Sequence, residues 1–228
     1  MAMRDADIRT VCVLGAGGFG TALALRLADH GIDTRVAARK DGSGAPVAPE
    51  PLRARDLVRP TPEALDGADA VVLALPFTAA LNLAERFPGF AEGRIVVDAT
   101  NPLTDEGDGL LLPAGASGAV EIARRVPYAR LVKGFSTQTP DDLSGSGTAA
   151  PVNFVAGDDE SAKYSVIRLS RRLSLPAVDA GVLAHCSVLE GMVLLREEIV
   201  RRNRGRPGAA TAVSGELSRT AFPEENRS

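Results

Sequence analysis

The chain is poor in aromatic residues and has no excess of positive charge. Its 228 residues include seven Phe, two Tyr and no Trp, so stacking of bases or sugars on aromatic side chains is not expected. Lys and Arg number 26 against 29 Asp and Glu, and the net charge of −3 argues against a generally basic nucleic-acid binder. With 45% apolar and 24% charged residues, the composition is that of a globular chain that can bury a sizeable core.

Cysteine, histidine and long apolar runs are also scarce. Cys12 and Cys186, with only two histidines beside them, are too few for a disulfide framework or a zinc cluster. The longest apolar run, Ala70 to Phe77, is far shorter than the roughly 20 residues that span a bilayer. Asp5 and Asp7 lie where a signal peptide would be basic and then apolar. We therefore expect a reduced, cytoplasmic protein with no metal site and no membrane or nucleic-acid partner.

Short apolar runs alternate with helical patterns along the chain. A β-branched run from Ile8 to Leu14 leads into glycines and a helix that ends near Gly31, and a second strand at 33–37 completes a βαβ unit. Further strands are expected near 56–58 and at 70–75, 94–98, 129–133, 152–156 and 177–178, helices at 117–127 and after Asp158 or Asp159, and loops at 41–51 and 104–116. This order predicts an α/β fold with a doubly wound, mostly parallel Rossmann sheet.

The last expected helix, from Leu183 to about Arg202, is apolar on two sides. Its stripes are Val188, Met192, Leu195 and Ile199, and Leu189, Val193 and Val200. Since one stripe is enough to cover a sheet, we expect the other to pack on a second copy of the chain as a homodimer. The expected divisions are a Rossmann domain at 1–180, a helical cap at 181–203 and a disordered tail at 204–228. The arginines near the helix end complement its dipole.

A glycine motif, G-x-G-x-x-G, follows the first strand and begins the first helix. In this context Gly15 makes the tight turn, Gly17 lets the backbone approach a pyrophosphate, and Gly20 lets helix and strand pack closely. Free N–H groups from about Gly18 to Thr21, that of Phe19 included, would bind the phosphate oxygens with help from the helix dipole. The motif predicts a dinucleotide site.

The residues after the second strand predict which dinucleotide is bound. An NAD site normally has Asp or Glu there, whereas this chain has Ala38 followed by Arg39 and Lys40. A guanidinium can pair with a 2′-phosphate and stack on adenine, so the sequence favours NADP(H).

The nicotinamide end is expected at the carboxyl ends of the later strands. Leu75, Pro76 and Phe77 follow one strand and Asn101 follows the next. Ordinary alternatives exist, since Phe77 could be core and Asn101 a turn former before a proline. On the substrate side we expect Ser136, Thr137 and His185.

Several ordered motifs resemble the small NADP oxidoreductases that exchange hydride with a deazaflavin coenzyme, and the reductase domain of membrane metalloreductases. They are VLGAGGFGTALALRLADHG at 13–31, the pair Arg39 and Lys40, VVLALPF at 71–77, VVDATNPL at 96–103, LVKGFST at 131–137, VAGDDESAK at 155–163 and VDAGVLAHCSVLEGM at 178–192. The resemblance covers about residues 9–200. It implies NADP(H) as cofactor, a short C-terminal helical cap, and a deazaflavin or another flat hydride partner stacked on the nicotinamide.

The sequence thus predicts an NADP-dependent oxidoreductase that transfers hydride between the nicotinamide and a deazaflavin. Two alternatives stay open: an NADPH-dependent reductase of a small imine or carbonyl compound, and a non-catalytic NADP(H)-binding regulatory module. Hydride transfer between flat rings needs no protein acid, so no catalytic side chain is expected. His185 and Lys133, with the hydroxyls of Ser136 and Thr137, are the possible proton donors near the expected cleft.

Overall fold

The protein folds around one eight-stranded sheet, which a computed structural model describes for residues 7–39, 46–145 and 152–203. The strand order is β3-β2-β1-β4-β5-β6-β7-β8, and all pairs are parallel except β6 with β7. The strands are β1 Thr10–Leu14, β2 Asp33–Ala37, β3 Val58–Arg59, β4 Ala70–Leu73, β5 Ile95–Asp98, β6 Arg130–Lys133, β7 Asn153–Gly157 and β8 Ala177–Asp179. The doubly wound, mostly parallel sheet predicted from the sequence is confirmed.

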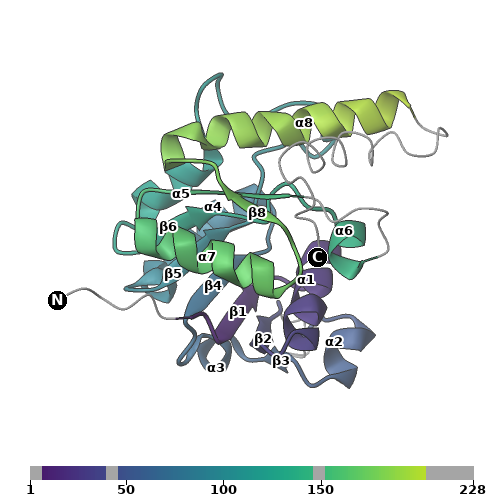
Figure 1. Cartoon of the computed structure of the whole chain (residues 1–228), viewed down its shortest axis with the longest axis vertical. Coiled ribbons are helices and arrows are strands. Elements are labelled where there is room, and N and C mark those ends of the chain that lie inside the picture. The colour runs from purple at the N-terminus through teal and green to yellow at the C-terminus, as the bar shows by residue number, and fades with distance from the viewer. Residues whose placement is uncertain (1–6, 40–45, 146–151, 204–228) are drawn as a thin grey trace, which may run out of the picture.

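Helices cover both faces of the sheet (Figure 1). The helical segments are α1 Gly18–Asp29, α2 Glu50–Ala54, α3 Thr61–Leu65, α4 Phe77–Arg86, η1 Pro88–Ala91, α5 Gly118–Arg125, α6 Pro140–Ser144, α7 Glu160–Arg172, η2 Leu183–His185 and α8 Cys186–Arg202. The core forms two clusters, one on each face: α1, α6 and α7 pack on one, and α3, α4, α5 and α8 on the other. Along β1, Val11 and Val13 join the first cluster while Cys12 and Leu14 join the second, which explains why the strand is apolar throughout.

One helix, α2, differs from expectation near the first crossover. A loop was expected over 41–51, but α2 begins at Glu50. Pro51 lies in its first turn, where a backbone N–H has no helical acceptor and its absence costs nothing, so proline does not prevent the helix. Residues 40–45, which include Lys40, and the predicted tail at 204–228 lie outside the described residues.

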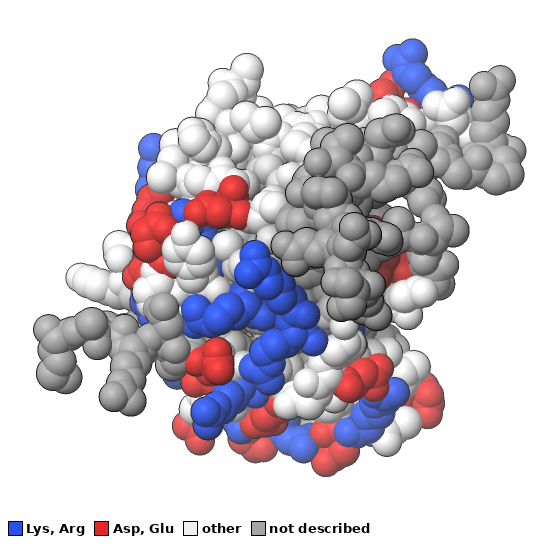
Figure 2. Space-filling view, viewed as in Figure 1, with Lys and Arg blue, Asp and Glu red and all other residues white. Residues whose placement is uncertain are grey.

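Basic side chains gather across the middle of the face seen in Figure 2, over α7 and its neighbours. Two arginines, Arg26 and Arg172, hold separate elements together. Arg26 of α1 donates from Nε to the carbonyl of Leu173 at 2.8 Å and from Nη1 to that of Leu143 at 2.9 Å. Arg172 donates to the carbonyl of Ile8 at 2.8 Å. Within the described ranges, no helix is both long and apolar enough to cross a membrane.

Candidate functional site

The turn between β1 and α1 depends on two glycines that the fold itself requires. Gly15 has φ +120°, and a Cβ there would lie 2.2 Å from the carbonyl oxygen of Ala74 at the end of β4. At Gly20 a Cβ would lie 2.2 Å from the carbonyl oxygen of Gly15. Side chains at either place would force the helix away from the sheet. The roles predicted for Gly15 and Gly20 as turn and packing glycines agree with this geometry.

Gly17 is a glycine that no described neighbour requires. Its φ of −72° suits any residue, and among the described residues no atom lies within 4 Å of the position a Cβ would take. It is the N-cap of α1, and it has no side chain with which to cap the helix. The first turn of α1 also contains no acidic residue, so its N–H groups keep their partial positive charge for a group from outside the chain.

A cleft of about 410 Å³ opens next to this turn, at the carboxyl ends of β1, β4, β5 and β6. Two walls and a floor meet here. The glycine turn forms one wall, the ends of β4 to β6 form the floor, and α8 forms the wall opposite. The lining residues are Gly17, Gly18, Phe19, Gly20, Ala74, Leu75, Pro76, Phe77, Ala99, Thr100, Asn101, Leu103, Ser136, Gln138, Thr139, Pro140, Val193, Arg196 and Glu197.

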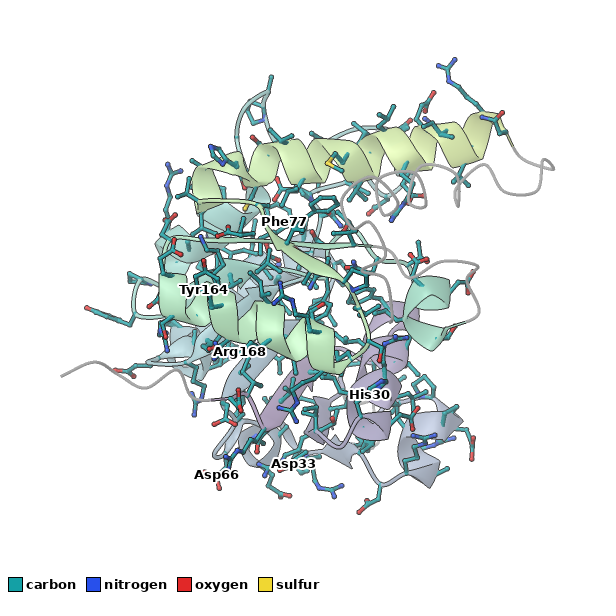
Figure 3. The ribbon with its side chains drawn as sticks, in the orientation of Figure 1. His30, Asp33, Asp66, Phe77, Tyr164 and Arg168 are labelled. Carbon is teal, nitrogen blue, oxygen red and sulfur yellow. The ribbon has the colours of Figure 1, made fainter. Side chains whose placement is uncertain are left out.

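Phe77, at the start of α4, serves the core as well as the cleft. It is 4% exposed and packs in the cluster that includes Leu183, Cys186 and Leu189. A Cβ at Gly118 would lie 2.8 Å from its ring, so α5 approaches the ring closely. Figure 3 shows Phe77 beneath α8, far from His30 at the end of α1. Both interpretations of Phe77, core residue and cleft residue, agree with this position.

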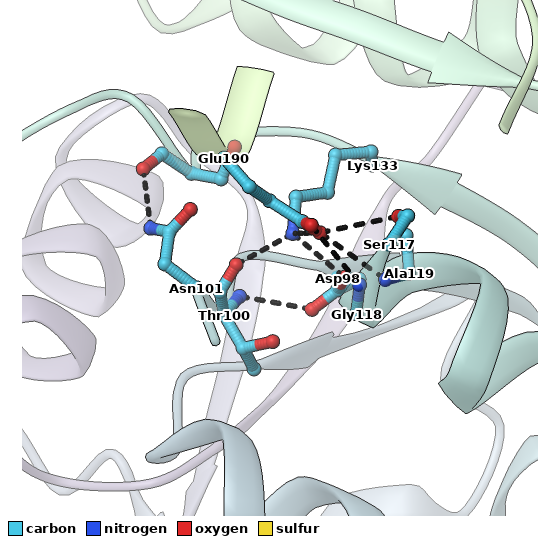
Figure 4. Close-up of polar contacts among 9 residues, drawn as sticks. Asp98, Thr100, Asn101, Ser117, Gly118, Ala119, Lys133 and Glu190 are labelled. Carbon is cyan, nitrogen blue, oxygen red and sulfur yellow. Dashed lines mark hydrogen bonds and ion pairs between the residues drawn. The ribbon is translucent and has the colours of Figure 1, made fainter. Parts of the chain in front are cut away.

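A buried ion cluster lies behind the floor and joins β5, β6, α5 and α8 (Figure 4). The Lys133 ammonium donates to Asp98 at 2.9 Å, to the carbonyl of Thr100 at 2.6 Å and to Glu190 at 3.1 Å. Asp98 in turn accepts from the backbone N–H of Thr100 at 2.9 Å. The cluster therefore fixes the backbone of the floor at Thr100.

Glu190 is the second carboxylate that pairs with the Lys133 ammonium, so the cluster carries one excess negative charge. The N-terminus of α5 compensates this charge. The oxygens of Glu190 accept from the N–H groups of Gly118 at 3.0 Å and Ala119 at 3.2 Å, and from the Ser117 hydroxyl at 3.3 Å. These bonds place a carboxylate at a helix N-terminus, where the dipole favours it. Burial disfavours the charged form of Lys133, but the two carboxylates outweigh burial and raise its pKa above the ordinary value.

Lys133 is therefore not placed as the sequence suggested. It was expected near the cleft as a possible proton donor, but its side chain has no exposed surface and it does not line the cleft. Its ammonium has three acceptors within the cluster, so it acts as a structural cation. Cys186, also buried near this cluster, is no nucleophile, because burial raises the pKa of its thiol to about 12.

The backbone between β6 and the floor is held in an unusual conformation. Phe135 has φ +58° although it carries a large side chain, and that side chain is completely buried. Its N–H donates to Oδ1 of Asn153 in β7 at 2.7 Å, which holds the turn in place. Strained residues of this kind concentrate at functional sites, and Phe135 directly precedes Ser136, which lines the cleft.

Not all of the predicted site residues meet at the cleft. Arg39 follows β2 and is exposed, at the end of the sheet to which the glycine turn belongs. Thr137 does not line the cleft; its carbonyl instead accepts from Arg196 at 2.5 Å. His185 is exposed in η2 beside Gly181 and is also absent from the lining.

The sequence predicted Ser136, which lines the cleft, but it did not identify the residues of α8 or Gln138 of the turn after β6, which line it as well. Arg196 bonds to Thr137 and pairs with Glu197 at 2.9 Å, so it links α8 to the floor. Gln138 lies 4% exposed beside Ser136. Arg196 reaches the cleft because α8 crosses the strand ends, and Gln138 lies there in the turn before α6. No sequence motif marks either position.

Comparison with known proteins gives a family match that includes the glycine turn and the strands next to it. Residues 10–102 match the family model described as NADP oxidoreductase coenzyme F420-dependent, as the motifs predicted. The glycerol-3-phosphate dehydrogenase [NAD(P)+] of Thermus thermophilus is 34% identical over 165 residues, which cover 59% of this chain and 47% of the dehydrogenase. The rat metalloreductase STEAP3 is 26% identical over 188 residues, covering 81% of this chain and 36% of that protein. The chain thus spans about half, or less, of the length of these curated relatives.

Among solved structures, one from Arthrobacter sp. FB24, proposed to be an F420-dependent NADP reductase, superposes with a TM-score of 0.72. It is 24% identical, and the match covers 85% of this chain and 94% of that one. At this identity the likeness concerns the fold.

Proposed function

Because residues 10–102 match coenzyme F420-dependent NADP oxidoreductases, we propose that this protein transfers hydride between NADP(H) and a deazaflavin coenzyme. The observation that carries the proposal is Gly17. A glycine at a helix N-terminus, with no described atom within 4 Å of its missing Cβ, leaves room for a group from outside the chain. That room opens into a cleft at the carboxyl ends of the strands, where Rossmann proteins bind dinucleotides.

The cradle suits the pyrophosphate of a dinucleotide. Gly18 and Phe19 present N–H groups at the start of the 12-residue helix α1, and the helix dipole favours negative charge there. Arg39, at the end of β2, is suited to a 2′-phosphate, for which a carboxylate in that place would be repulsive. The residues therefore fit NADP(H) better than NAD(H).

The rest of the cleft is suited to two flat rings in contact. The apolar residues Leu75, Pro76 and Val193 line opposite sides of it, and water excluded from such a site cannot compete for the transferred hydride. When bound, the nicotinamide supplies the hydride chemistry itself. This chain's residues bind and orient the rings, which is where most of the rate enhancement of such a reaction arises.

The test is direct. We expect purified protein mixed with NADPH and oxidised deazaflavin to consume both in equal amounts, followed by their separate absorbances, and to use NADH much less well. Binding of NADPH without any turnover, with deazaflavin or with small imines and carbonyl compounds, would favour a regulatory module. Turnover with an imine or carbonyl compound alone would identify a reductase of that class.

We also propose that the protein forms a homodimer through α8. Leu189 and Val193 of this helix are buried against the chain's own core, whereas Val188 is 65% and Leu195 is 57% exposed. Val188, Met192, Leu195 and Ile199 follow one another at steps of four, three and four residues, the spacing of a coiled-coil seam. A second copy of the same helix offers a self-complementary stripe with which to cover them.

A further inference from the structure

Four buried oxygen atoms beneath the cleft have no hydrogen-bond partner within the described part of the chain. They are Oγ1 of Thr100, Oδ1 of Asn101, Oγ of Ser136 and Oε1 of Gln138. All four residues line the cleft, at the carboxyl ends of β5 and β6. Buried polar atoms are almost always paired, so four unpaired atoms around one cleft indicate that its usual occupant supplies the missing partners.

The two amides among them are fixed in direction. Nδ2 of Asn101 donates to the backbone carbonyl of Ser136 at 2.8 Å, and Nε2 of Gln138 donates to that of Val152 at 3.0 Å. A carbonyl oxygen can only accept, so neither amide can be flipped without losing its bond. Their free atoms are therefore oxygens, which require an N–H or O–H donor.

The two hydroxyls are free to serve either role. Neither Ser136 nor Thr100 has a side-chain hydrogen bond to break, and each hydroxyl is able to rotate toward a group in the cleft as donor or acceptor. The set of four thus offers two fixed acceptors and two adjustable groups within one floor. A planar group that carries both an N–H and a C=O matches this set.

We propose that the floor formed by Thr100, Asn101, Ser136 and Gln138 recognises a planar CO–NH group of the bound ligand. This proposal rests on the proposed function and names the chemical group of the ligand that the floor of the cleft binds. Two sources of the group are compatible with hydride exchange: the carboxamide of the nicotinamide ring, and the imide of the deazaflavin ring. In both cases the floor would bind the ring at its edge, and the face of the ring would stay free to receive or give hydride.

Thr100→Val and Ser136→Ala test the floor, because each deletes an unpartnered oxygen and no hydrogen bond of the free protein. We expect the Tm of the free variants to be unchanged or higher, since a buried unpaired hydroxyl is costly. The affinity for the ligand should fall while the Tm does not, by about threefold to tenfold for each hydrogen bond that the variant loses. Thr34→Val is the matched control: it removes a buried hydroxyl that bonds to the Ile32 carbonyl at 2.9 Å, so its Tm should fall and ligand binding should not change.

Two measurements separate the sources. For the carboxamide, the unmodified protein should bind NADP⁺ more tightly than its 3-acetylpyridine analogue, which keeps the C=O and lacks the N–H that the two amide oxygens accept. Both variants should weaken the binding of NADP⁺ and of the analogue by the same factor, because the C=O that the hydroxyls serve is present in both. For the imide, NADP⁺ affinity should stay constant while the KM for deazaflavin rises threefold or more. If neither NADP⁺ affinity nor this KM changes by more than twofold in both variants, the floor does not recognise the group, although the proposed function stands. Failure of the unmodified protein to bind NADP⁺ would remove both proposals.

Discussion

At the scale of single residues, two glycines of one turn are glycine for different reasons. Gly15 is required by the chain, because of its φ of +120° and the nearby carbonyl of Ala74. Gly17 has open space and an ordinary φ. A side chain at the first should therefore affect folding, and a side chain at the second should affect binding.

We expect Gly15→Ala to lower the free energy of unfolding by about 1–3 kcal/mol through backbone strain. Gly17→Val should keep the unfolding free energy within about 1 kcal/mol of the parent, because no described atom is displaced, but should abolish measurable NADPH binding. Thermal unfolding and NADPH fluorescence titration of both variants measure the two effects. Undiminished NADPH affinity in Gly17→Val would show that the turn is not a phosphate cradle.

The exposed Arg39 gives the next prediction. A charge-assisted hydrogen bond contributes about 1.5–3 kcal/mol, so Arg39→Ala should weaken NADPH binding roughly tenfold to a hundredfold. NADH, which has no 2′-phosphate, should bind almost as before. Titration of both cofactors against both proteins checks this, and an equal loss for the two cofactors would contradict the assignment of Arg39 to the phosphate.

At the scale of elements, α7 begins with a carboxylate that also holds β6. Asp159 accepts from Arg130 at 2.8 and 2.9 Å and from the N–H of Ala162 at 2.8 Å. The hydrogen bond with Arg130, opposed by partial burial and aided by the helix N–H groups, lowers the pKa of Asp159 from 3.8 to about 2.

A pKa lowered by folding adds stability that is present above the unfolded value and is lost as pH falls toward the folded one. The contribution of Asp159 should therefore disappear between about pH 4 and pH 2. We expect Asp159→Asn to have a lower Tm than the parent at pH 7 and a shallower fall of Tm across that interval. Parallel Tm curves below pH 4 would mean that Asp159 does not contribute to the acid sensitivity.

The buried cluster of Lys133, Asp98 and Glu190 ties α8 to the sheet. Lys133→Met would leave two buried carboxylates without a cation and should cost about 3–5 kcal/mol. Glu190→Gln keeps the pair of Lys133 with Asp98 and should cost less. Urea unfolding of the two variants measures which of them loses more of its free energy of unfolding. A Lys133→Met protein as stable as the parent would show that the ammonium does not hold the cluster together.

Much of the strand pattern could be predicted because β-branched apolar runs reveal buried strands directly. Strand β2 has the expected bounds, and β1, β5, β6 and β8 differ from expectation by one or two residues. Short helices such as α3 and α6, each of five residues, lack the length for a periodic signal. The antiparallel direction of β7 was also hidden, since a strand buried on both faces reads the same in either direction.

The site was predictable where a local motif carries it and not where distant segments meet. The glycine turn lies within six consecutive residues, and its geometry follows from them. The pairing of Lys133 with Glu190 joins residues 57 positions apart, on elements whose contact depends on the whole sheet. The same is true of Arg196, which reaches the floor only because α8 crosses the strand ends.

At the scale of the whole molecule, the exposed stripe of α8 predicts the oligomeric state. Leu195→Glu would place a charge at the centre of the proposed seam and should convert a dimer to a monomer, with little change in the Tm extrapolated to low concentration. Tyr128→Glu is the control, because Tyr128 is 77% exposed on another part of the surface. Light scattering at several concentrations gives the mass. A parent protein that is monomeric throughout would contradict the dimer.

The strand order also has a consequence for how the protein is made. Strands β3, β2, β1, β4 and β5 are adjacent in the sheet and lie within residues 10–98, while β6 to β8 are added in chain order along one edge. Since the ribosome synthesises the N-terminal part first, the glycine turn and the strands next to it emerge before Lys133 and Glu190 have been synthesised. The glycine-turn wall of the cleft is therefore synthesised first and the α8 wall last, and the cleft is complete only once Glu190 of α8 has paired with Lys133 of β6.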